Sequence, residues 1–426
     1  MQESKPKMAC GPPHALVSVS IYVQMQVILQ DAEELIHSRF KISLSAHDNA
    51  FHGFAEGNRG VGIFARRSGY WSNTRRCCFR ELPISGHLQL WRLKFRHRRP
   101  IGGPGPSAGT KRPSLLRKTF RKAVRRTSYY RFSEKLGLPY LSAYLDSIGT
   151  NFRHGANFAT GGSSIRPGGY SPFHLDLQIS HFMQFKFRSS ALYKQLSNNG
   201  NGSACRTNLP KPEDFSKALY TFDIGQNDLA FGFQHTDEER TGAFIPHILD
   251  TFTQAIHQLY KRGARFFWIH NTGPIGCLPY NVIYYNLKPR NLDKNGCVRP
   301  QNEVAEDFNK QLKNRVFQLR AQLPHAAITY VDVYSAKYDL ISNAKNLGFV
   351  NPMEFCCGSY YGYHIDCGKR AIVNGTVYGN PCKNPTKHIS WDGIHYSQAA
   401  NLLIAERILN GSLSDPPLSL WDACHI

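Results

Sequence analysis

Short apolar runs and long amphipathic helices alternate along the chain from about Glu134 onward, and this alternation restricts the possible folds more than any other feature. Three runs, 218–224, 265–270 and 326–334, have the composition of buried parallel strands. Two helices are predicted between them from apolar residues at 3.6-residue spacing: Ile245, Ile248, Leu249, Phe252, Ile256 and Leu259, then Val304, Phe308, Leu312, Val316, Leu319 and Leu323. Single helices between strands imply parallel pairing through right-handed crossovers. We therefore predict an α/β fold, a doubly wound α/β/α sandwich around a mostly parallel sheet, with sites at the carboxyl ends of the strands.

Positive charge is concentrated in the first 133 residues. They contain 24 Lys and Arg against 7 Asp and Glu, a net charge of +17 out of +22 for the whole chain. The stretch 84–132 has 14 basic residues and no acidic residue. Such a run is typical of a solvated or disordered tail, or of an arm that binds nucleic acid or a membrane surface. We therefore divide the chain into a basic, poorly ordered segment, 1–133, and a folded domain, 134–426.

The composition excludes several classes of protein. With 41% hydrophobic residues over 426 positions, the chain is neither an intrinsically disordered protein nor a collagen. No run of about 18 apolar residues occurs, so we do not expect an integral membrane protein. The glycine pairs in the chain do not have the spacing of a phosphate-binding loop, and the pattern predicts no nucleotide cofactor.

The cysteines divide at the same boundary as the charge. Eight lie in the predicted domain: Cys205, Cys277, Cys297, Cys356, Cys357, Cys367, Cys382 and Cys424. None has the Cys-x-x-Cys spacing of a zinc ribbon, so we expect no metal site. The even number of cysteines indicates disulfides instead, formed in an oxidising compartment. The connectivity stays open, although we expect the adjacent Cys356 and Cys357 to pair elsewhere rather than with each other.

Three glycosylation sequons, at Asn201, Asn374 and Asn410, agree with a secreted protein. The chain offers no convincing signal peptide, however. The stretch 15–29 is fairly apolar, but Gln24 and Gln26 interrupt it and no small-residue cleavage site follows.

A carboxylate stands three residues before an imidazole near the C-terminus, in Ser390-Trp391-Asp392-Gly393-Ile394-His395. In a turn, this spacing lets Asp392 fix the tautomer of His395 and stabilise its charged form. A surface pair or a polar loop explains a lone Asp-x-x-His equally simply. Two further clusters add hydrogen-bond donors: the small-residue turn 157–163 and the strand end 225–228, which contains Asn227. Together they suit an oxyanion hole, although a glycine turn and a helix cap are the ordinary alternatives.

Four blocks in this order, 155–162, 222–228, 271–277 and 391–395, resemble the plant GDSL-type esterase/lipase family of the SGNH hydrolase superfamily, and the resemblance extends from Glu134 to the C-terminus. It implies an SGNH/flavodoxin-like fold and assigns roles by matching position. Gly162 and Asn227 match the oxyanion-hole residues, Asp392 the charge-relay acid and His395 the general base. It also implies no cofactor, a small-molecule, lipid or glycan ester as substrate, secretion from the cell and a monomeric enzyme.

The family's first block, the Gly-Asp-Ser turn that supplies the nucleophile, is absent from the chain. Without it, His395 has no hydroxyl to activate. We also expect the first strand of the sheet to be lost, so that it is either missing or improvised from other residues. The codons of His87 to Arg99 can nevertheless be chosen so that they spell IFNFGDSNSDTGG one nucleotide later, which resembles that block. We therefore interpret 84–132 as an out-of-frame translation of the nucleophile region, in which the serine codon combines the end of the Leu93 codon with the first base of Lys94.

Two other functions remain open at this point. The first is a catalytically inactive pseudoenzyme that keeps the pocket and binds an ester or glycan. The second is nucleic-acid binding through the basic run. We do not favour nucleic acid as a partner, because the run belongs to no known binding module and has few aromatic residues for base stacking.

Overall fold

The computed structural model describes residues 16–20, 141–145, 150–198, 206–284, 291–360, 364–365, 367, 371–373, 376–420 and 422. The chain divides into two compact units, Met1–Gly57 with Ala123–Ile426, and Asn58–Lys122, and every described residue belongs to the first. The predicted boundary between 133 and 134 and the basic stretch 84–132 lie outside the described residues, so both stay predictions.

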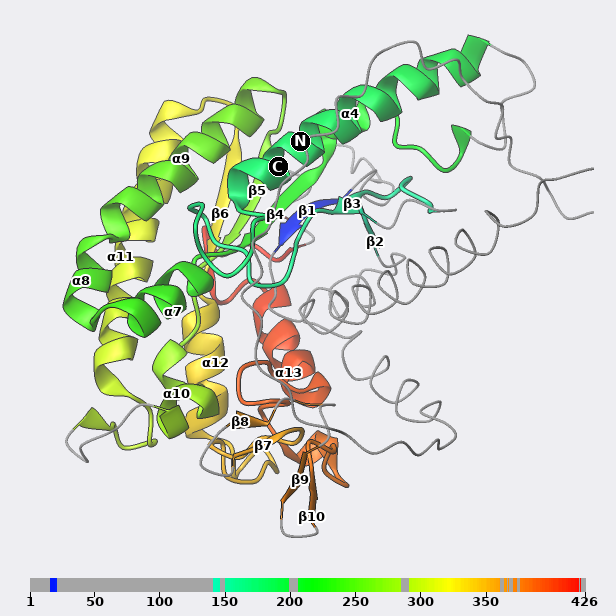
Figure 1. Cartoon of the computed structure of the whole chain (residues 1–426). Coiled ribbons are helices and arrows are strands. Elements are labelled where there is room, and N and C mark those ends of the chain that lie inside the picture. The colour runs from blue at the N-terminus through cyan, green and yellow to red at the C-terminus, as the bar shows by residue number, and fades with distance from the viewer. Residues whose placement is uncertain are drawn as a thin grey trace, which may run out of the picture. The chain divides into compact units, whose positions relative to one another are not determined.

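A seven-stranded sheet forms the centre of the first unit (Figure 1). The strands are β1 (Leu16–Ser20), β2 (Ser142–Ala143), β3 (Ala156–Asn157), β4 (Leu219–Asp223), β5 (Phe266–His270), β6 (Ala327–Val331) and β11 (Ser414–Asp415). Their order is β11-β6-β5-β4-β1-β3-β2, and every neighbouring pair is parallel except β11 with β6. The three apolar runs predicted as strands are β4, β5 and β6, so the prediction of a mostly parallel sheet is confirmed.

Helices connect these strands. They are α4 (Leu175–Asn198), α6 (Asp214–Lys217), α7 (Gln226–His235), α8 (Glu238–Ala243), α9 (Ile245–Lys261), α10 (Pro279–Tyr284), α11 (Arg299–Gln322), α12 (Val333–Ser342) and α13 (Gln398–Leu409). The two predicted amphipathic helices are α9 and α11. Gly263, with φ +98°, follows the end of α9, and Pro324 follows the end of α11. No helix within the described ranges is both long enough and apolar enough to cross a membrane.

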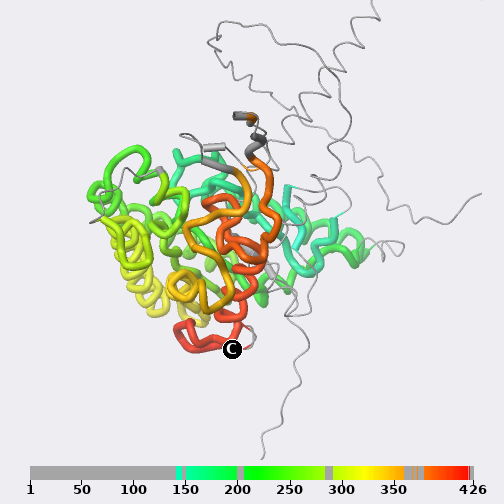
Figure 2. Tube along the Cα trace, turned by 90° about the horizontal axis from the view of Figure 1, so that it is seen from below, coloured from blue at the N-terminus to red at the C-terminus, as the bar shows by residue number. Residues whose placement is uncertain are grey.

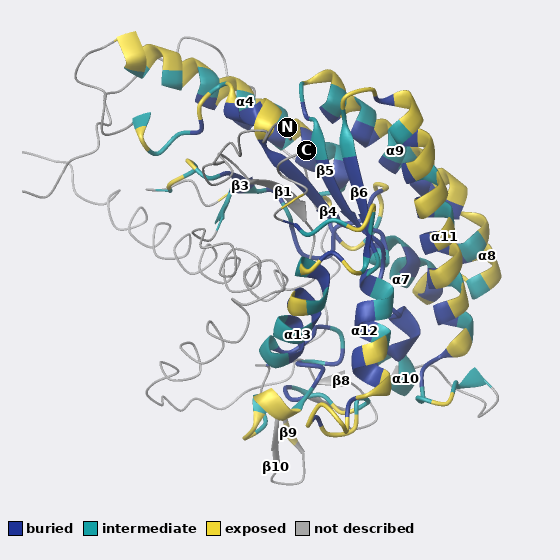
Figure 3. Cartoon of the chain, turned by 180° about the vertical axis from the view of Figure 1, so that it is seen from behind, coloured by how far each residue is buried: buried dark blue, intermediate teal, exposed yellow. Residues whose placement is uncertain are grey.

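Two hydrophobic cores lie on opposite faces of the sheet. Alternate residues of a strand point to opposite faces, so Tyr220 and Phe222 pack with α4, α9 and α11, whereas Leu219 and Trp268 pack with α12 and α13. Figure 3 shows β4, β5 and β6 as mostly buried, and α12 and α13 lie side by side in Figures 1 and 2. The α/β/α sandwich predicted from the sequence is confirmed.

Of the two expected outcomes, a missing first strand or an improvised one, the structure has the improvised strand. β1 occupies the place between β4 and β3, with five residues in register from Leu16 opposite Leu219 to Ser20 opposite Asp223. Main-chain hydrogen bonds hold a strand regardless of its side chains, so an apolar, β-branched segment from elsewhere in the chain can take this place.

Two small antiparallel hairpins follow the sandwich helices, β7 (Ser359–Tyr360) with β8 (His364–Ile365), and β9 (Ala371–Val373) with β10 (Thr376–Tyr378). They belong to the cysteine-rich segment 356–382, which contains the disulfides Cys356–Cys382 and Cys357–Cys367. The prediction that the two adjacent cysteines pair elsewhere is confirmed. A third disulfide joins Cys277 to Cys297, while Cys205 and Cys424 lie outside the described residues.

Candidate active site

The loop 390–397 brings a carboxylate and an imidazole into direct contact. Oδ2 of Asp392 lies 2.5 Å from Nδ1 of His395, and Oδ1 accepts the backbone N–H groups of His395 at 2.8 Å and Ile394 at 3.1 Å. Burial alone raises the pKa of Asp392, but the imidazole and these hydrogen bonds outweigh burial and hold the pKa below its ordinary value. Asp392 is therefore ionised at neutral pH and orients His395 through Nδ1.

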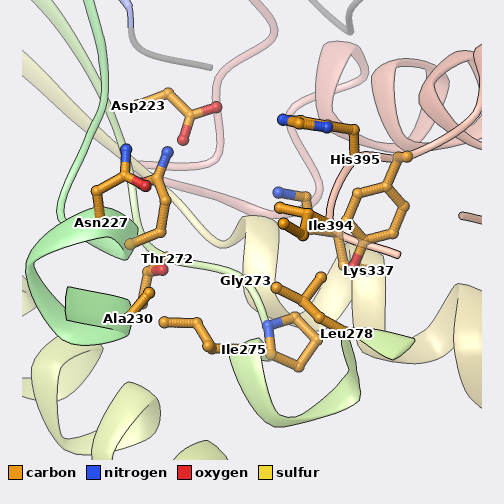
Figure 4. A pocket seen from close by; sticks show the side chains of 13 residues that line it. Asp223, Asn227, Ala230, Thr272, Gly273, Ile275, Leu278, Lys337, Ile394 and His395 are labelled. Carbon is orange, nitrogen blue, oxygen red and sulfur yellow. The ribbon is translucent and has the colours of Figure 1, made fainter. Parts of the chain in front are cut away.

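The other ring nitrogen of His395 faces a pocket. Nε2 is buried and has no hydrogen-bond partner in the part of the chain that the structure describes. The pocket has a volume of about 80 Å³, and both His395 and Asn227 line it (Figure 4). A buried nitrogen of this kind is costly to leave unsatisfied. The ring is thus placed to accept a proton from a group inside the pocket.

The cysteine-rich segment holds the loop from outside. The backbone N–H of Cys356 donates to the carbonyl of Ser390 at 3.2 Å, and that of Cys357 donates to the carbonyl of Trp391 at 2.6 Å. Because each of these cysteines is in a disulfide, the covalent links lie one hydrogen bond away from the loop that contains Asp392 and His395.

Asn227 lies across the pocket from His395 (Figure 4), and Gly162 precedes Ser163, the residue that Asn227 contacts. Asn227 is buried in the first turn of α7, and its Nδ2 donates to the carbonyl of Ser163 at 2.7 Å. Gly162 has φ +71°, and a Cβ there would lie 3.2 Å from Cβ of Tyr170, so the turn requires glycine. Asn227 lines the pocket with His395, whereas Gly162 is not one of the described residues that line it and is linked to Asn227 through Ser163.

Asp228 fixes the glycine turn to α7. Its carboxylate accepts the backbone N–H of Ile165 at 2.8 Å and that of Arg166 at 3.1 Å. Burial raises the pKa of Asp228 to about 6, and the hydrogen bonds from these amides oppose that rise only partly. No role was predicted for Asp228 from the sequence. Its position directly after Asn227 was the only indication that it belongs to the site.

Polar residues of the pocket that were not predicted include Asp223, Gln226, Thr272 and Lys337. Asp223 is the last residue of β4, and Thr272 follows the end of β5 by two residues. Both therefore obey the rule that sites lie at the carboxyl ends of parallel strands, which was the signal that could have found them. Lys337 lies on α12, where nothing in the sequence distinguished it. The rest of the wall includes apolar side chains: Ala230, Pro274, Ile275, Leu278 and Ile394.

Two clusters have the ligand types of a metal site, Cys356 with Cys382 and His388, and Cys277 with Asp293 and Cys297. In both clusters the two cysteines are joined in a disulfide. A cysteine ligates a metal as its thiolate, so these cysteines do not offer that ligand in the oxidised protein.

Of the three sequons, only Asn410 lies among the described residues. It is exposed at the end of α13, and its Oδ1 accepts hydrogen bonds from the backbone and hydroxyl of Ser412. Asn201 and Asn374, like the stretch that contains the shifted serine codon, lie outside the described ranges. Glycosylation and the position of the nucleophile therefore stay predictions.

Sequence comparisons find relatives of this chain among plant proteins. A family model described as GDSL-like Lipase/Acylhydrolase matches residues 108–408. A GDSL esterase/lipase of Arabidopsis thaliana is 53% identical over 303 residues, which cover 69% of this chain and 77% of that protein. The GDSL esterase/lipase ACHE of Zea mays is 49% identical over 308 residues, covering 69% and 76%. Alpha-L-fucosidase 3 of Arabidopsis thaliana is 48% identical over 293 residues, covering 66% and 77%.

Proposed function

Because this chain belongs to the GDSL-like lipase/acylhydrolase family, a family of ester hydrolases, we propose that its site cleaves carboxylic esters by serine acyl transfer. One observation carries the proposal. The buried Nε2 of His395 opens into a pocket shared with Asn227, while the ionised Asp392 holds the other side of the ring.

In the proposed mechanism a serine hydroxyl in the pocket donates its proton to Nε2 of His395 as its oxygen attacks the ester carbonyl. Asp392 stabilises the imidazolium that forms. His395 then returns the proton to the leaving alcohol, and the acyl-enzyme remains. A water molecule repeats the sequence in reverse, giving its proton to His395 and releasing the carboxylic acid and the free serine.

The oxyanion of the tetrahedral intermediate needs hydrogen-bond donors. The amide of Asn227 has two N–H groups, and one of them donates to the carbonyl of Ser163. The second is available to the oxyanion, and the backbone N–H of Gly162 is the other donor that we propose. The contact with Ser163 supports this assignment, because it fixes the orientation of the amide relative to the turn.

For the nucleophile, we propose that the gene encodes the serine in the frame one nucleotide beyond that of 84–132. One fact supports this: shifted codons in that stretch are compatible with the family's first block. The match to the family model begins at residue 108, inside this stretch, so the proposed change of frame needs to be tested at the transcript. The alternative is that the stated frame is the translated one. The protein is then a pseudoenzyme that binds an ester or glycan without turning it over.

We further propose that the enzyme acts outside the cell as a monomer on acyl lipids or on acetyl and related esters. Three disulfides in the described part of the chain support an oxidising compartment, and so does the exposed sequon at Asn410. One relative is named an alpha-L-fucosidase, so an aryl fucoside belongs in the substrate panel.

The test is to sequence the transcript across the codons of Pro83 to Glu134 and to assay two proteins. One is the 426-residue chain, and the other is the chain with the shifted frame restored, hereafter the frame-restored protein. We expect only the frame-restored protein to hydrolyse p-nitrophenyl acetate and butyrate. A transcript in the stated frame, together with an inactive frame-restored protein, would overturn the proposed esterase and leave the pseudoenzyme.

A further inference from the structure

One hydroxyl group of the pocket wall has no hydrogen-bond partner. Thr272, two residues beyond the end of β5, lines the pocket and is 1% exposed. Its Oγ1 is buried and forms no hydrogen bond with any residue that the structure describes. The fold gains nothing from this hydroxyl, because valine has the same shape and would bury no unsatisfied polar atom. A ligand of the pocket therefore explains the hydroxyl better than packing does.

The main chain of Thr272 is held at both of its polar groups. Oδ1 of Asn309 accepts the Thr272 N–H at 2.9 Å, and Nδ2 of Asn309 donates to the Thr272 carbonyl at 2.9 Å. Asn309 lies on α11 and is itself buried. The branched Cβ of threonine restricts χ1 as well. The hydroxyl therefore has few positions open to it, as a preorganised donor requires.

The hydroxyl lies on the side of the pocket that we propose for the oxyanion. Thr272 follows β5 and Asn227 follows β4, and these strands are parallel neighbours in the sheet. Neighbouring strands lie about 4.8 Å apart, so residues just beyond their ends reach the same region. Figure 4 shows Thr272 on the Asn227 side of the pocket. Because Nδ2 of Asn227 gives one hydrogen to the carbonyl of Ser163, only its second hydrogen can serve an oxyanion.

We propose that Thr272 is a further catalytic residue, whose hydroxyl donates a hydrogen bond to the oxyanion beside the amide of Asn227. The negative charge then meets a donor from beyond the end of each of two neighbouring strands, in addition to the backbone N–H of Gly162. As the carbonyl oxygen becomes negative, the hydrogen bond from Thr272 strengthens, and the hydroxyl keeps its proton throughout. This role rests on the proposed function, because the oxyanion forms only when an ester is attacked.

The first test compares three forms of the frame-restored protein in the hydrolysis of p-nitrophenyl acetate. Thr272→Val removes the hydroxyl and keeps the shape, so kcat should fall about 10- to 100-fold with KM unchanged. Thr272→Ser keeps a hydroxyl at the same place and should retain most of the parent's kcat. A kcat unchanged in Thr272→Val would overturn the proposal. So would a KM that rises while kcat stays constant, because Thr272 would then act only in substrate binding.

Stability separates a catalytic hydroxyl from a structural one. Thr272→Val exchanges an unpaired buried hydroxyl for a methyl group, so urea unfolding of the 426-residue chain should show equal or greater stability. Thr241→Val is the matched control, since Thr241 is 3% exposed but its Oγ1 donates to the carbonyl of Asp237 at 2.7 Å. That variant should unfold at lower urea and keep the parent's kcat. A loss of stability in Thr272→Val as large as in Thr241→Val would mean that the hydroxyl serves the fold, and would overturn the proposal.

A binding experiment tests the same hydroxyl without turnover. The probes are dimethylphosphinate, a tetrahedral anion, and dimethyl sulfone, a neutral molecule of the same shape, and each is titrated into the 426-residue chain and followed by NMR. We expect Thr272→Val to weaken binding of the anion about tenfold and to leave binding of the sulfone unchanged. Equal affinity of parent and Thr272→Val for the anion, or no binding of the anion, would overturn the role of Thr272. If the frame-restored protein hydrolyses no ester while the expected binding difference is found, the proposed function fails and the anion site stands.

Discussion

The side of the site that we propose for acid–base chemistry and the side that we propose for the oxyanion are built in opposite ways. Every hydrogen bond described for Asp392 goes to a residue within three positions along the chain. Asn227 and Asp228 instead reach partners 62 to 64 residues away, on the loop 163–166. The acid–base pair therefore depends on one short loop and its anchoring, whereas the oxyanion side depends on the whole sheet being assembled.

The largest difference should appear in catalysis. In the frame-restored protein, Asp392→Asn should lower kcat by about 10³- to 10⁴-fold, because asparagine neither holds the required tautomer of His395 nor stabilises its charge. The measurement is the steady-state hydrolysis of p-nitrophenyl acetate. Asp250→Asn, an exposed carboxylate on α9, is the matched control and should keep full activity. A kcat within tenfold of the parent would remove Asp392 from the mechanism.

Loss of the oxyanion amide should cost less. Asn227→Ala should lower kcat by about 10²- to 10³-fold with little change in KM, since the donor acts mainly on charge that develops in the transition state. Asn343→Ala, at the exposed end of α12, serves as the control. An increase in KM with unchanged kcat would contradict the assignment, because Asn227 would then act only in substrate binding.

A disulfide anchors the loop of Asp392 and His395, and this anchoring is a further difference between the two sides of the site. Replacing Cys356 and Cys382 by alanine should cost about 3.5 kcal/mol of unfolding free energy, from the loop that the bond closes. Hydrogen exchange should also accelerate at the amides of 390–397, because the backbone contacts of Cys356 and Cys357 with this loop weaken. Replacing Cys277 and Cys297 should cost a similar free energy without this local change. Equal exchange in both variants would show that the disulfide does not anchor the loop.

The smallest effect is a difference in pH dependence between two carboxylates. The pKa of Asp228 is raised to about 6 in the folded chain, so its folded form keeps a proton that the unfolded chain has lost between pH 4 and 6. Stability from this group therefore falls as the pH rises, by at most about 3 kcal/mol. Asp392, with a lowered pKa, contributes stability above its ordinary pKa that is lost as the pH falls.

Urea unfolding at several pH values tests both signs. Asp228→Asn should remove the decline between pH 4 and 6 relative to the parent chain, and Asp392→Asn should remove the loss in acid. If Asp228→Asn left the slope unchanged, burial would not be controlling that carboxyl group.

The same comparison explains how much of the fold and of the site could be predicted from the sequence. Asp392 and His395 lie three residues apart in a closed loop, so the sequence alone indicated their contact. The strands β4, β5 and β6 and the helices α9 and α11 were also predictable, because their apolar periodicity matches burial on two faces of one sheet. The hydrogen bonds that Asp228 accepts from Ile165 and Arg166 could not be predicted, because they join segments far apart in the sequence and no local pattern contains them.

The pocket wall illustrates the same limit. Asp223 and Thr272 stand at strand ends, where the topology of the sheet predicts a site once the strands are known. Lys337 lies within a helix whose sequence predicts only that it packs, and its place in the pocket depends on how α12 crosses the sheet. Which segment would form the improvised strand β1 was not predictable, because main-chain pairing does not require the residues of the family's first block.

That strand has an evolutionary consequence. The slot between β3 and β4 recognises an extended backbone rather than a particular sequence, and Leu16–Ser20 fills it in full register with β4. Selection on folding and selection on catalysis therefore act on different properties of the same segment. Under the change of frame that we propose, a lineage would lose turnover at once but keep an assembled sheet, and its pocket would be open to selection for binding.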